Sequence, residues 1–155
     1  MRAAAVQLTA TADKAANLDR ATRLVGEAAA AGAALVVLPE MFNCLGTCAE
    51  LAAGAEPLDG PTAAWASERA RQHGITLVAG TFVEAGATPE DRRRNTCTVW
   101  GPDGERLAVY RKIHLFDVSV PGAEYHESSV IAPGDEVVVA ATPAGAVGLT
   151  VCYDL

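Results

Sequence analysis

The sequence predicts an α/β protein with a layered sheet of mixed strand direction and helices on at least one face. At the start of the chain, two apolar runs that suit buried strands, Ala3–Leu8 and Ala33–Leu38, flank a helical pattern over Lys14–Ala31. Further along, pairs of apolar runs around turn residues favour hairpins. A βαβ beginning followed by hairpins is typical of a mixed sheet.

Two segments carry the signals of helices. Within Lys14–Ala31 five apolar residues fall on one face, namely Leu18, Ala21, Leu24, Val25 and Ala28. Gly32 suits the position that ends this helix. Pro61 fits the first turn of a second helix that runs to His73, and Gly74 provides its stop.

The rest of the chain is divided into strands and loops. Strands are expected at Ile75–Phe82, at Thr96–Trp100 and Leu107–Arg111 around the turn Gly101–Glu105, and at Val137–Ala141 and Val147–Val151 around Thr142–Gly145. Loops are expected at Met41–Gly60, Gly86–Arg94 and Ile113–Gly134. The last loop spans more than twenty residues, and loops of that length inside a compact domain are usually functional.

The composition restricts the class of protein. Half of the 155 residues are hydrophobic and a fifth are charged, which indicates one globular domain over 1–155. The net charge of −7 argues against a general nucleic-acid binder, and the apolar runs are too short for a membrane span. The N-terminus lacks a signal-peptide pattern, so we expect a cytoplasmic protein with reduced thiols at Cys44, Cys48, Cys97 and Cys152. The cysteine spacing does not favour zinc, and no glycine-rich nucleotide loop is present.

Three reactive side chains stand at or just beyond the ends of expected strands. Glu40 follows an apolar run in VVLPEMF, Lys112 lies in YRKIHLFD, and Cys152 lies in GLTVCYDL. Lysine is scarce, since Lys14 is the other one against ten arginines. Each residue alone has a plainer interpretation, as a surface carboxylate, a surface lysine or a packing cysteine. Their common placement favours a shared site, because ligands collect at the carboxyl ends of strands in α/β proteins.

These three residue types suit nucleophilic catalysis by a thiol. A thiol reacts as the thiolate, so a nearby carboxylate such as Glu40 is needed to accept its proton. The ammonium of Lys112 can stabilise the oxyanion that forms when sulfur attacks a carbonyl or nitrile carbon. The backbone N–H of Tyr153 is a candidate second donor, because a turn from strand to helix points N–H groups toward the nucleophile.

The three motifs together resemble those of the nitrilase superfamily, the carbon–nitrogen hydrolases. They occur in the family's order, with 72 positions from Glu40 to Lys112 and 40 from Lys112 to Cys152. The resemblance implies that Glu40 is the general base and acid, Lys112 the oxyanion stabiliser and Cys152 the nucleophile. It also implies a second glutamate beside the lysine, which matches Glu127 in YHESSVIAPG. A solvated loop acid is the alternative interpretation of Glu127.

The resemblance carries further expectations. It implies an αββα sandwich and a homo-oligomer, with no metal and no organic cofactor. The segment KIHLFD, followed by VPG and HES, is most similar to the Nit-type branch, whose amidases act on ω-amides of short keto dicarboxylates or on deaminated glutathione. Nitrilases and ureidopropionases are similar in the core motifs, and a hydrolase of that kind stays an alternative. Cys44 and Cys48 are expected to pack, and His114 and His126 are given no catalytic role.

The chain differs from the family in where it ends. Family members continue beyond the cysteine motif, whereas this sequence stops at Leu155, three residues after Cys152. We therefore expect a sandwich that lacks its C-terminal part. Ligands for a substrate carboxylate are expected beyond Leu155 or in the loops Met41–Cys48 and Ile113–Glu127. The chain then has two interpretations, a truncated amidase or a non-catalytic half that acts only with a partner polypeptide.

Overall fold

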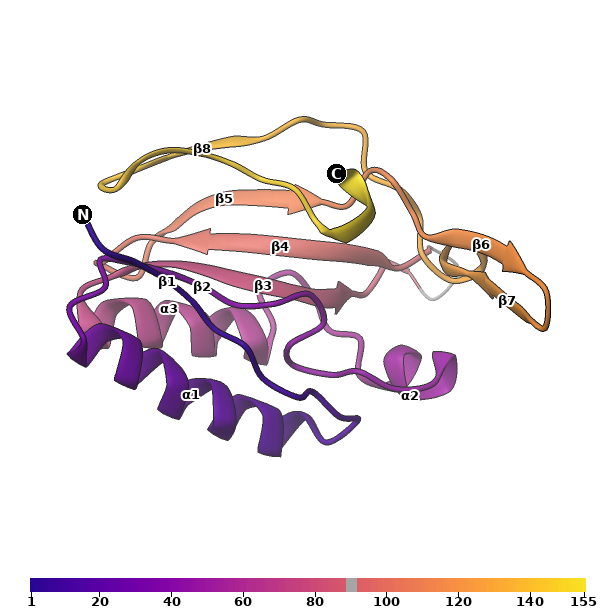
Figure 1. The fold of residues 1–155 in the computed structure, drawn as a ribbon, viewed down its shortest axis with the longest axis horizontal. Helices are drawn as coiled ribbons and strands as arrows, with labels where there is room; N and C mark the ends of the chain where they lie inside the picture. The colour runs from indigo at the N-terminus through magenta and orange to yellow at the C-terminus, as the bar shows by residue number, and fades with distance from the viewer. Residues whose placement is uncertain (89–91) are drawn as a thin grey trace.

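The computed structural model describes residues 1–88 and 92–155, which form a mixed sheet with helices on one face (Figure 1). Within these residues the main sheet has five strands in the order β1-β2-β3-β4-β5, namely β1 (Ala3–Ala5), β2 (Leu35–Val37), β3 (Thr76–Glu84), β4 (Arg94–Trp100) and β5 (Arg106–Arg111). The first three strands are parallel, and β4 and β5 are antiparallel to their neighbours. The predicted mixed α/β architecture is confirmed.

The two long helices begin and end where the sequence signals place them. In α1 (Lys14–Ala30) the carboxylate of Asp13 accepts a hydrogen bond from the Ala16 N–H at 3.0 Å. In α3 (Pro61–His73) the chain leaves the helix through Gly74, which adopts the left-handed conformation at φ 62°. None of the helices in the described part of the chain has the length and apolar character needed to cross a membrane.

The sheet separates two apolar cores. One lies between the sheet and the helices, where many side chains are alanines that let α1 and α3 approach closely; it includes Ala21, Val25, Val36, Phe42, Ala63, Ala66, Ala70 and Leu77. The other lies on the opposite face, under the hairpin of β8 (Val139–Thr142) and β9 (Gly145–Gly148) (Figure 1). It contains Val78, Cys97, Val99, Tyr110, Ala140, Leu149 and Val151. The last residues of the chain are therefore anchored over β4 and β5.

The last hairpin is displaced from the predicted boundaries. We expected its strands at Val137–Ala141 and Val147–Val151, but β8 and β9 lie closer to the turn. Thr142 stabilises this tight turn, because its Oγ1 donates to the Gly145 carbonyl at 2.8 Å. After β9 one further bond joins the strands, from the Leu149 N–H to the Val138 carbonyl at 3.1 Å, and the side chains of Leu149 and Val151 enter the second core.

Two predicted loops contain regular structure. The expected loop Met41–Gly60 includes α2 (Cys48–Ala53), which is stabilised by a capping box between Thr47 and Glu50. The expected loop Ile113–Gly134 includes the hairpin of β6 (Asp117–Val120) and β7 (Ala123–His126) and the short 3₁₀ helix η1 (Glu127–Ser129). Figure 1 shows this hairpin extending beyond the end of the main sheet. Of the predicted loop Gly86–Arg94, positions 89–91 lie outside the described residues, and Arg94 begins β4.

A bulge in β3 places the segment that carries Glu40. Gly80 lies in the left-handed region at φ 52°, where the register between β3 and β4 shifts. Just beside it, the Thr81 N–H donates to the Pro39 carbonyl at 3.3 Å, and the Thr81 Oγ1 accepts from the Met41 N–H at 2.9 Å. These two bonds bracket Glu40 and fix its backbone at the end of β2.

A side chain at position 80 is therefore expected to disturb the fold. A Cβ on Gly80 would lie 2.1 Å from the Pro39 carbonyl oxygen, and its backbone conformation is costly for other residues. We expect Gly80→Ala to lower the free energy of unfolding by about 3 kcal/mol. Urea unfolding measures this, with Gly148→Ala as the control, since nothing lies within 4 Å of a Cβ there. Equal stabilities of the two variants would contradict the role of Gly80.

Candidate active site

The structure brings Glu40, Lys112, Glu127 and Cys152 to one cavity of about 210 Å³. They come from four places, namely the segment after β2, the end of β5, the start of η1 and the final turn η2 (Cys152–Asp154). The rest of the cavity wall is mostly apolar and consists of Met41, Leu45, Gly46, Leu51, Phe116 and Tyr125. All four residues predicted from the motifs therefore share one small, largely apolar space.

Lys112 lies at the centre of this group. Its side chain is 1% exposed, and its Nζ donates to Glu40 Oε1 at 3.0 Å and to Glu127 Oε2 at 2.9 Å. Burial alone would lower the pKa of Lys112, but the hydrogen bonds and charges of the two glutamates outweigh it and raise the pKa. The lysine is therefore an ammonium ion held between two carboxylates.

Glu127 is fixed by the segment that follows Lys112. Its side chain is buried, and its Oε2 also accepts a hydrogen bond from the Phe116 N–H at 2.8 Å. Its own N–H donates to the Phe116 carbonyl at 3.2 Å. The alternative interpretation of Glu127 as a solvated loop acid is therefore wrong, because this carboxylate is buried and bonded to Lys112.

Cys152 occupies a strained backbone conformation at the end of the chain. It has φ 50°, which is uncommon for a residue other than glycine and is often found at functional sites. Burial raises the pKa of its thiol, as do the charge of Glu40 and a hydrogen bond to it, while Lys112 and the Tyr153 N–H act in the opposite direction. The thiol is therefore protonated at neutral pH and faces a carboxylate that can accept its proton.

The turn that carries Cys152 is held by Asp154, which the sequence analysis did not identify. Asp154 Oδ2 accepts from the Tyr110 hydroxyl at 2.5 Å and from the Val151 N–H at 2.8 Å. Its Oδ1 accepts from the His114 N–H at 2.9 Å. This carboxylate connects the cysteine turn to the residues on both sides of Lys112.

Two further predictions concern residues near the site. The Tyr153 N–H acts to lower the pKa of the Cys152 thiol, and the Tyr153 ring packs edge-on against Phe116 with centroids 5.5 Å apart. Cys44 is buried, as expected for a packing cysteine, but Cys48 is exposed because it begins α2 at the protein surface. The packing interpretation of Cys48 was therefore wrong.

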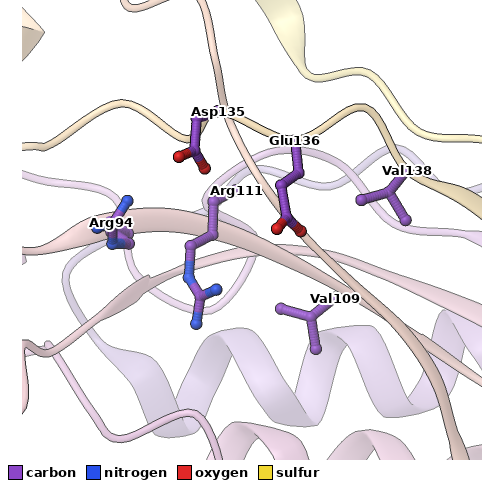
Figure 2. A pocket seen from close by; sticks show the side chains of 6 residues that line it. All are labelled: Arg94, Val109, Arg111, Asp135, Glu136 and Val138. Atoms are coloured by element: carbon purple, nitrogen blue, oxygen red, sulfur yellow. The ribbon is translucent and has the colours of Figure 1, made fainter.

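A larger cavity of about 310 Å³ lies elsewhere, against β4 and β5 (Figure 2). It is lined by Arg94, Val109, Arg111, Asp135, Glu136 and Val138. Its cations are engaged within the protein: Arg111 makes two hydrogen bonds to Glu84, both of 2.8 Å, and Arg94 donates to the Pro133 carbonyl at 2.9 Å. None of the predicted site residues lines it, so the smaller cavity is the candidate active site.

The mixed sheet and the group of Glu40, Lys112, Glu127 and Cys152 define an α/β protein of the nitrilase fold. Residues 2–155 match the family described as carbon-nitrogen hydrolase, and the chain belongs to that family. The solved structure of Saccharomyces cerevisiae Nit3, a member of the nitrilase superfamily, superimposes with a TM-score of 0.82 at 31% identity. The match covers 96% of this chain and 54% of that one.

Sequence relatives point to one group within the family. The omega-amidase NIT2 of Danio rerio is 44% identical over 157 residues, and that of Homo sapiens is 41% identical over 155 residues. Each match covers 99% of this chain and 55% of the relative. The chain thus spans little more than half the length of these relatives. The amidase from Nesterenkonia sp. AN1, solved after Michael addition of acrylamide at its active-site cysteine, gives a TM-score of 0.80 at 28% identity over 99% of this chain and 57% of that one.

Replacing Asp154 by asparagine is expected to destabilise the cysteine turn. An asparagine side chain has one acceptor oxygen, so the donors that bind the other oxygen of Asp154 lose their partner. We therefore expect Asp154→Asn to lower the free energy of unfolding by about 2 kcal/mol at pH 7. Burial would raise the pKa of Asp154, but hydrogen bonds from Tyr110, His114 and Val151 outweigh it and lower the pKa. A carboxyl with a lowered pKa stabilises the fold above its unfolded pKa and loses that contribution as the pH falls through its folded pKa.

The difference in unfolding free energy between the wild type and Asp154→Asn should therefore shrink below about pH 4. Urea unfolding at pH 7 and pH 3 measures it, and Asp19→Asn, at an exposed position on α1, is the control. A difference that stays constant over this range would show that the charge of Asp154 does not hold the turn.

Proposed function

We propose that this chain carries the catalytic site of an amidase that hydrolyses the C–N bond of a small amide through a thioester on Cys152 and releases ammonia. One observation carries the proposal: a thiol, an ammonium and two carboxylates meet in a single small cavity. Glu40 and Cys152 line the same cavity, and the charge of Glu40 acts on the pKa of the thiol, so the proposed base and nucleophile are neighbours. This arrangement supplies a nucleophile, a proton acceptor and an oxyanion stabiliser.

In the first half of the reaction, Glu40 takes the thiol proton and the sulfur of Cys152 attacks the amide carbonyl carbon. The negative charge that develops on the carbonyl oxygen is stabilised by the Lys112 ammonium and the Tyr153 N–H. The C–N bond then breaks as Glu40 returns the proton to the leaving nitrogen. Ammonia leaves, and the acyl group stays on sulfur as a thioester.

In the second half, water replaces ammonia in the cavity. Glu40 takes a proton from the water, whose oxygen attacks the thioester carbon, and the same two donors stabilise the second oxyanion. The C–S bond breaks, the carboxylic acid is released, and the sulfur of Cys152 regains its proton from Glu40. Glu127 holds the Lys112 ammonium in place throughout.

The substrate we propose is the ω-amide of a short keto or dicarboxylic acid. The support comes from the relatives named omega-amidase in vertebrates and from another, chloroplastic, in Arabidopsis thaliana at 37% identity over 155 residues. A cavity of about 210 Å³ suits a small molecule rather than a peptide. We further propose that the active form is a homo-oligomer, as the family resemblance implies.

Ammonia release tests the proposed reaction. In an intact form that includes the part of the relatives beyond the cysteine motif, the protein should release ammonia from α-ketoglutaramate, and Cys152→Ala should lower the rate at least about 1,000-fold because no thioester can form. Cys48→Ala is the matched control, since Cys48 is also exposed but begins α2 outside the four-residue group. Mass spectrometry should detect the acyl group on Cys152. Equal ammonia release by the wild type and Cys152→Ala would refute the mechanism.

The second prediction concerns the compact ammonium of Lys112. A guanidinium is larger and planar, so Lys112→Arg cannot keep both short carboxylate contacts and present a donor to the oxyanion. We expect kcat/KM to fall about 100-fold or more. The other lysine provides the matched control, since Lys14 binds Glu56 outside the cavity, and Lys14→Arg should keep its activity within a few-fold. Near-normal turnover by Lys112→Arg would remove the lysine from the reaction.

A further inference from the structure

A fifth polar residue completes the group at the site. Asn95 lies in β4 and is 1% exposed. Its Nδ2 donates to Glu40 Oε1 at 2.7 Å and to Glu127 Oε1 at 3.1 Å. Lys112 bonds to the same two glutamates from Nζ, and the Lys112 N–H donates to the Asn95 carbonyl at 2.9 Å. Two carboxylates and two donors thus form a closed ring.

The orientation of the Asn95 amide follows from its neighbours. Both carboxylates accept hydrogen bonds and donate none when ionised, so the NH₂ group must face them and the amide oxygen must face away. That oxygen, Oδ1, is buried and has no hydrogen-bond partner among the described residues. An unpaired buried acceptor is unfavourable for stability. Asn95 therefore contributes through the hydrogen bonds that its NH₂ group donates to the two glutamates.

The two carboxylate oxygens of Glu40 differ in the hydrogen bonds that they accept within the ring. Oε1 accepts from both Asn95 and Lys112, which matches the two lone pairs of a carboxylate oxygen. Oε2 is the oxygen that retains lone pairs for the thiol proton of Cys152. Without Asn95, two neighbouring carboxylates would share one ammonium, and their mutual repulsion would favour protonation of one of them.

We propose that Asn95 is a positioning residue of the catalytic site, whose NH₂ group holds Glu40 and Glu127 together around Lys112 and directs the proton of Cys152 to Oε2 of Glu40. This inference rests on the proposed function, because it assigns Asn95 a role through the general base. Asn95 itself transfers no proton. Its removal leaves every reacting group in place but changes the pH range in which Glu40 can accept a proton.

Several titratable groups surround the ring and enter any dependence on pH. They are Glu40 after β2, Cys48 at the start of α2, Lys112 directly after β5, Tyr125 in β7, Glu127 in η1 and Cys152 in the final turn. Burial raises the pKa of the Tyr125 hydroxyl above its ordinary value of 10.0, and the charges of Glu127, Cys48 and Glu40 act in the same direction while Lys112 opposes them. Its titration therefore lies above the range in which the carboxylates lose their protons.

The test is the alkylation rate of Cys152 by iodoacetamide from pH 5 to pH 9, followed peptide by peptide with mass spectrometry. Cys48, which is also exposed, gives an internal reference in the same sample. The wild type is compared with Asn95→Leu, which has a similar volume and no donor, and with Asn95→Asp, which has the same shape. Thr98→Val is the matched control, since it removes a buried hydrogen bond in β4, to Trp100, at a distance from the ring.

In the wild type we expect Cys152 to react faster than Cys48 at pH 7, because Glu40 accepts the thiol proton. In Asn95→Leu the acidic limb of the Cys152 profile should move up by about one pH unit, which lowers the alkylation rate by up to about tenfold at pH values on that limb. Asn95→Asp should lower the alkylation rate of Cys152 at least as much, because this substitution places a third carboxylate in the ring. Thr98→Val should leave the profile unchanged.

The opposite results separate the two proposals. If Cys152 in the wild type reacts no faster than Cys48, the proposed function fails. If Cys152 reacts faster than Cys48 but the pH profile of Asn95→Leu coincides with that of the wild type, the role of Asn95 is overturned. An equal shift of the profile in Thr98→Val would also overturn it. Loss of the folded state in both Asn95 variants, measured by circular dichroism, would also overturn it, because Asn95 would then be a residue of general stability.

Discussion

The pairing of one buried ammonium with two carboxylates constrains the rest of this structure. A charge with 1% exposure is very unfavourable unless it is paired and hydrogen-bonded, so Lys112 requires both Glu40 and Glu127. These residues lie far apart in the sequence, and their pairing brings together the segment after β2, the end of β5 and the segment after β7. The β6–β7 hairpin and η1 serve to return the chain so that Glu127 reaches the lysine.

The backbone around the site is held in unfavourable conformations by neighbouring hydrogen bonds. Met41, next to Glu40, has φ 52°, and Cys152 has φ 50°. Each costs on the order of 1 kcal/mol or more, and each persists because its surroundings fix it. Thr81 binds the Met41 N–H, and Asp154 binds the Val151 N–H just before the cysteine. The base and the thiol are thus presented by short turns that two specific side chains stabilise.

The sequence predicted more of the reactive residues than of the residues that position them. The three motifs identified Glu40, Lys112 and Cys152, and each of these residues follows or ends an apolar run that predicts a strand from local sequence alone. Asn95 and Asp154 could not be found in this way, since Asn95 binds Glu40 from 55 positions away, and Asp154 binds Tyr110 from 44 positions away besides the nearby Val151 N–H. Such contacts leave no local pattern.

The regular structure inside the two predicted loops was also missed, because its sequence signals are short. The spacing of Thr47 and Glu50 is a capping-box signal that could have revealed α2, whose six residues are too few for a clear apolar period. The hairpin of β6 and β7 has strands of four residues with mostly exposed side chains, so no alternation stood out. The second loop ends at the buried Glu127, whose burial leaves no local pattern in the sequence, so the family resemblance indicated this residue and the apolar pattern did not.

The charge balance of the site bears on how the thiol would react. Two carboxylates against one ammonium leave a net negative charge beside Cys152, and the pKa of the thiol is raised by burial and by Glu40 rather than lowered. A thiolate is therefore not stored in the resting site, unlike in an ion pair of thiolate and imidazolium. In the proposed mechanism, the sulfur gains its negative character only as Glu40 removes the proton during attack, when the charge passes on to a carbonyl oxygen beside Lys112. This order of events depends on a general base that is in place before the attack begins.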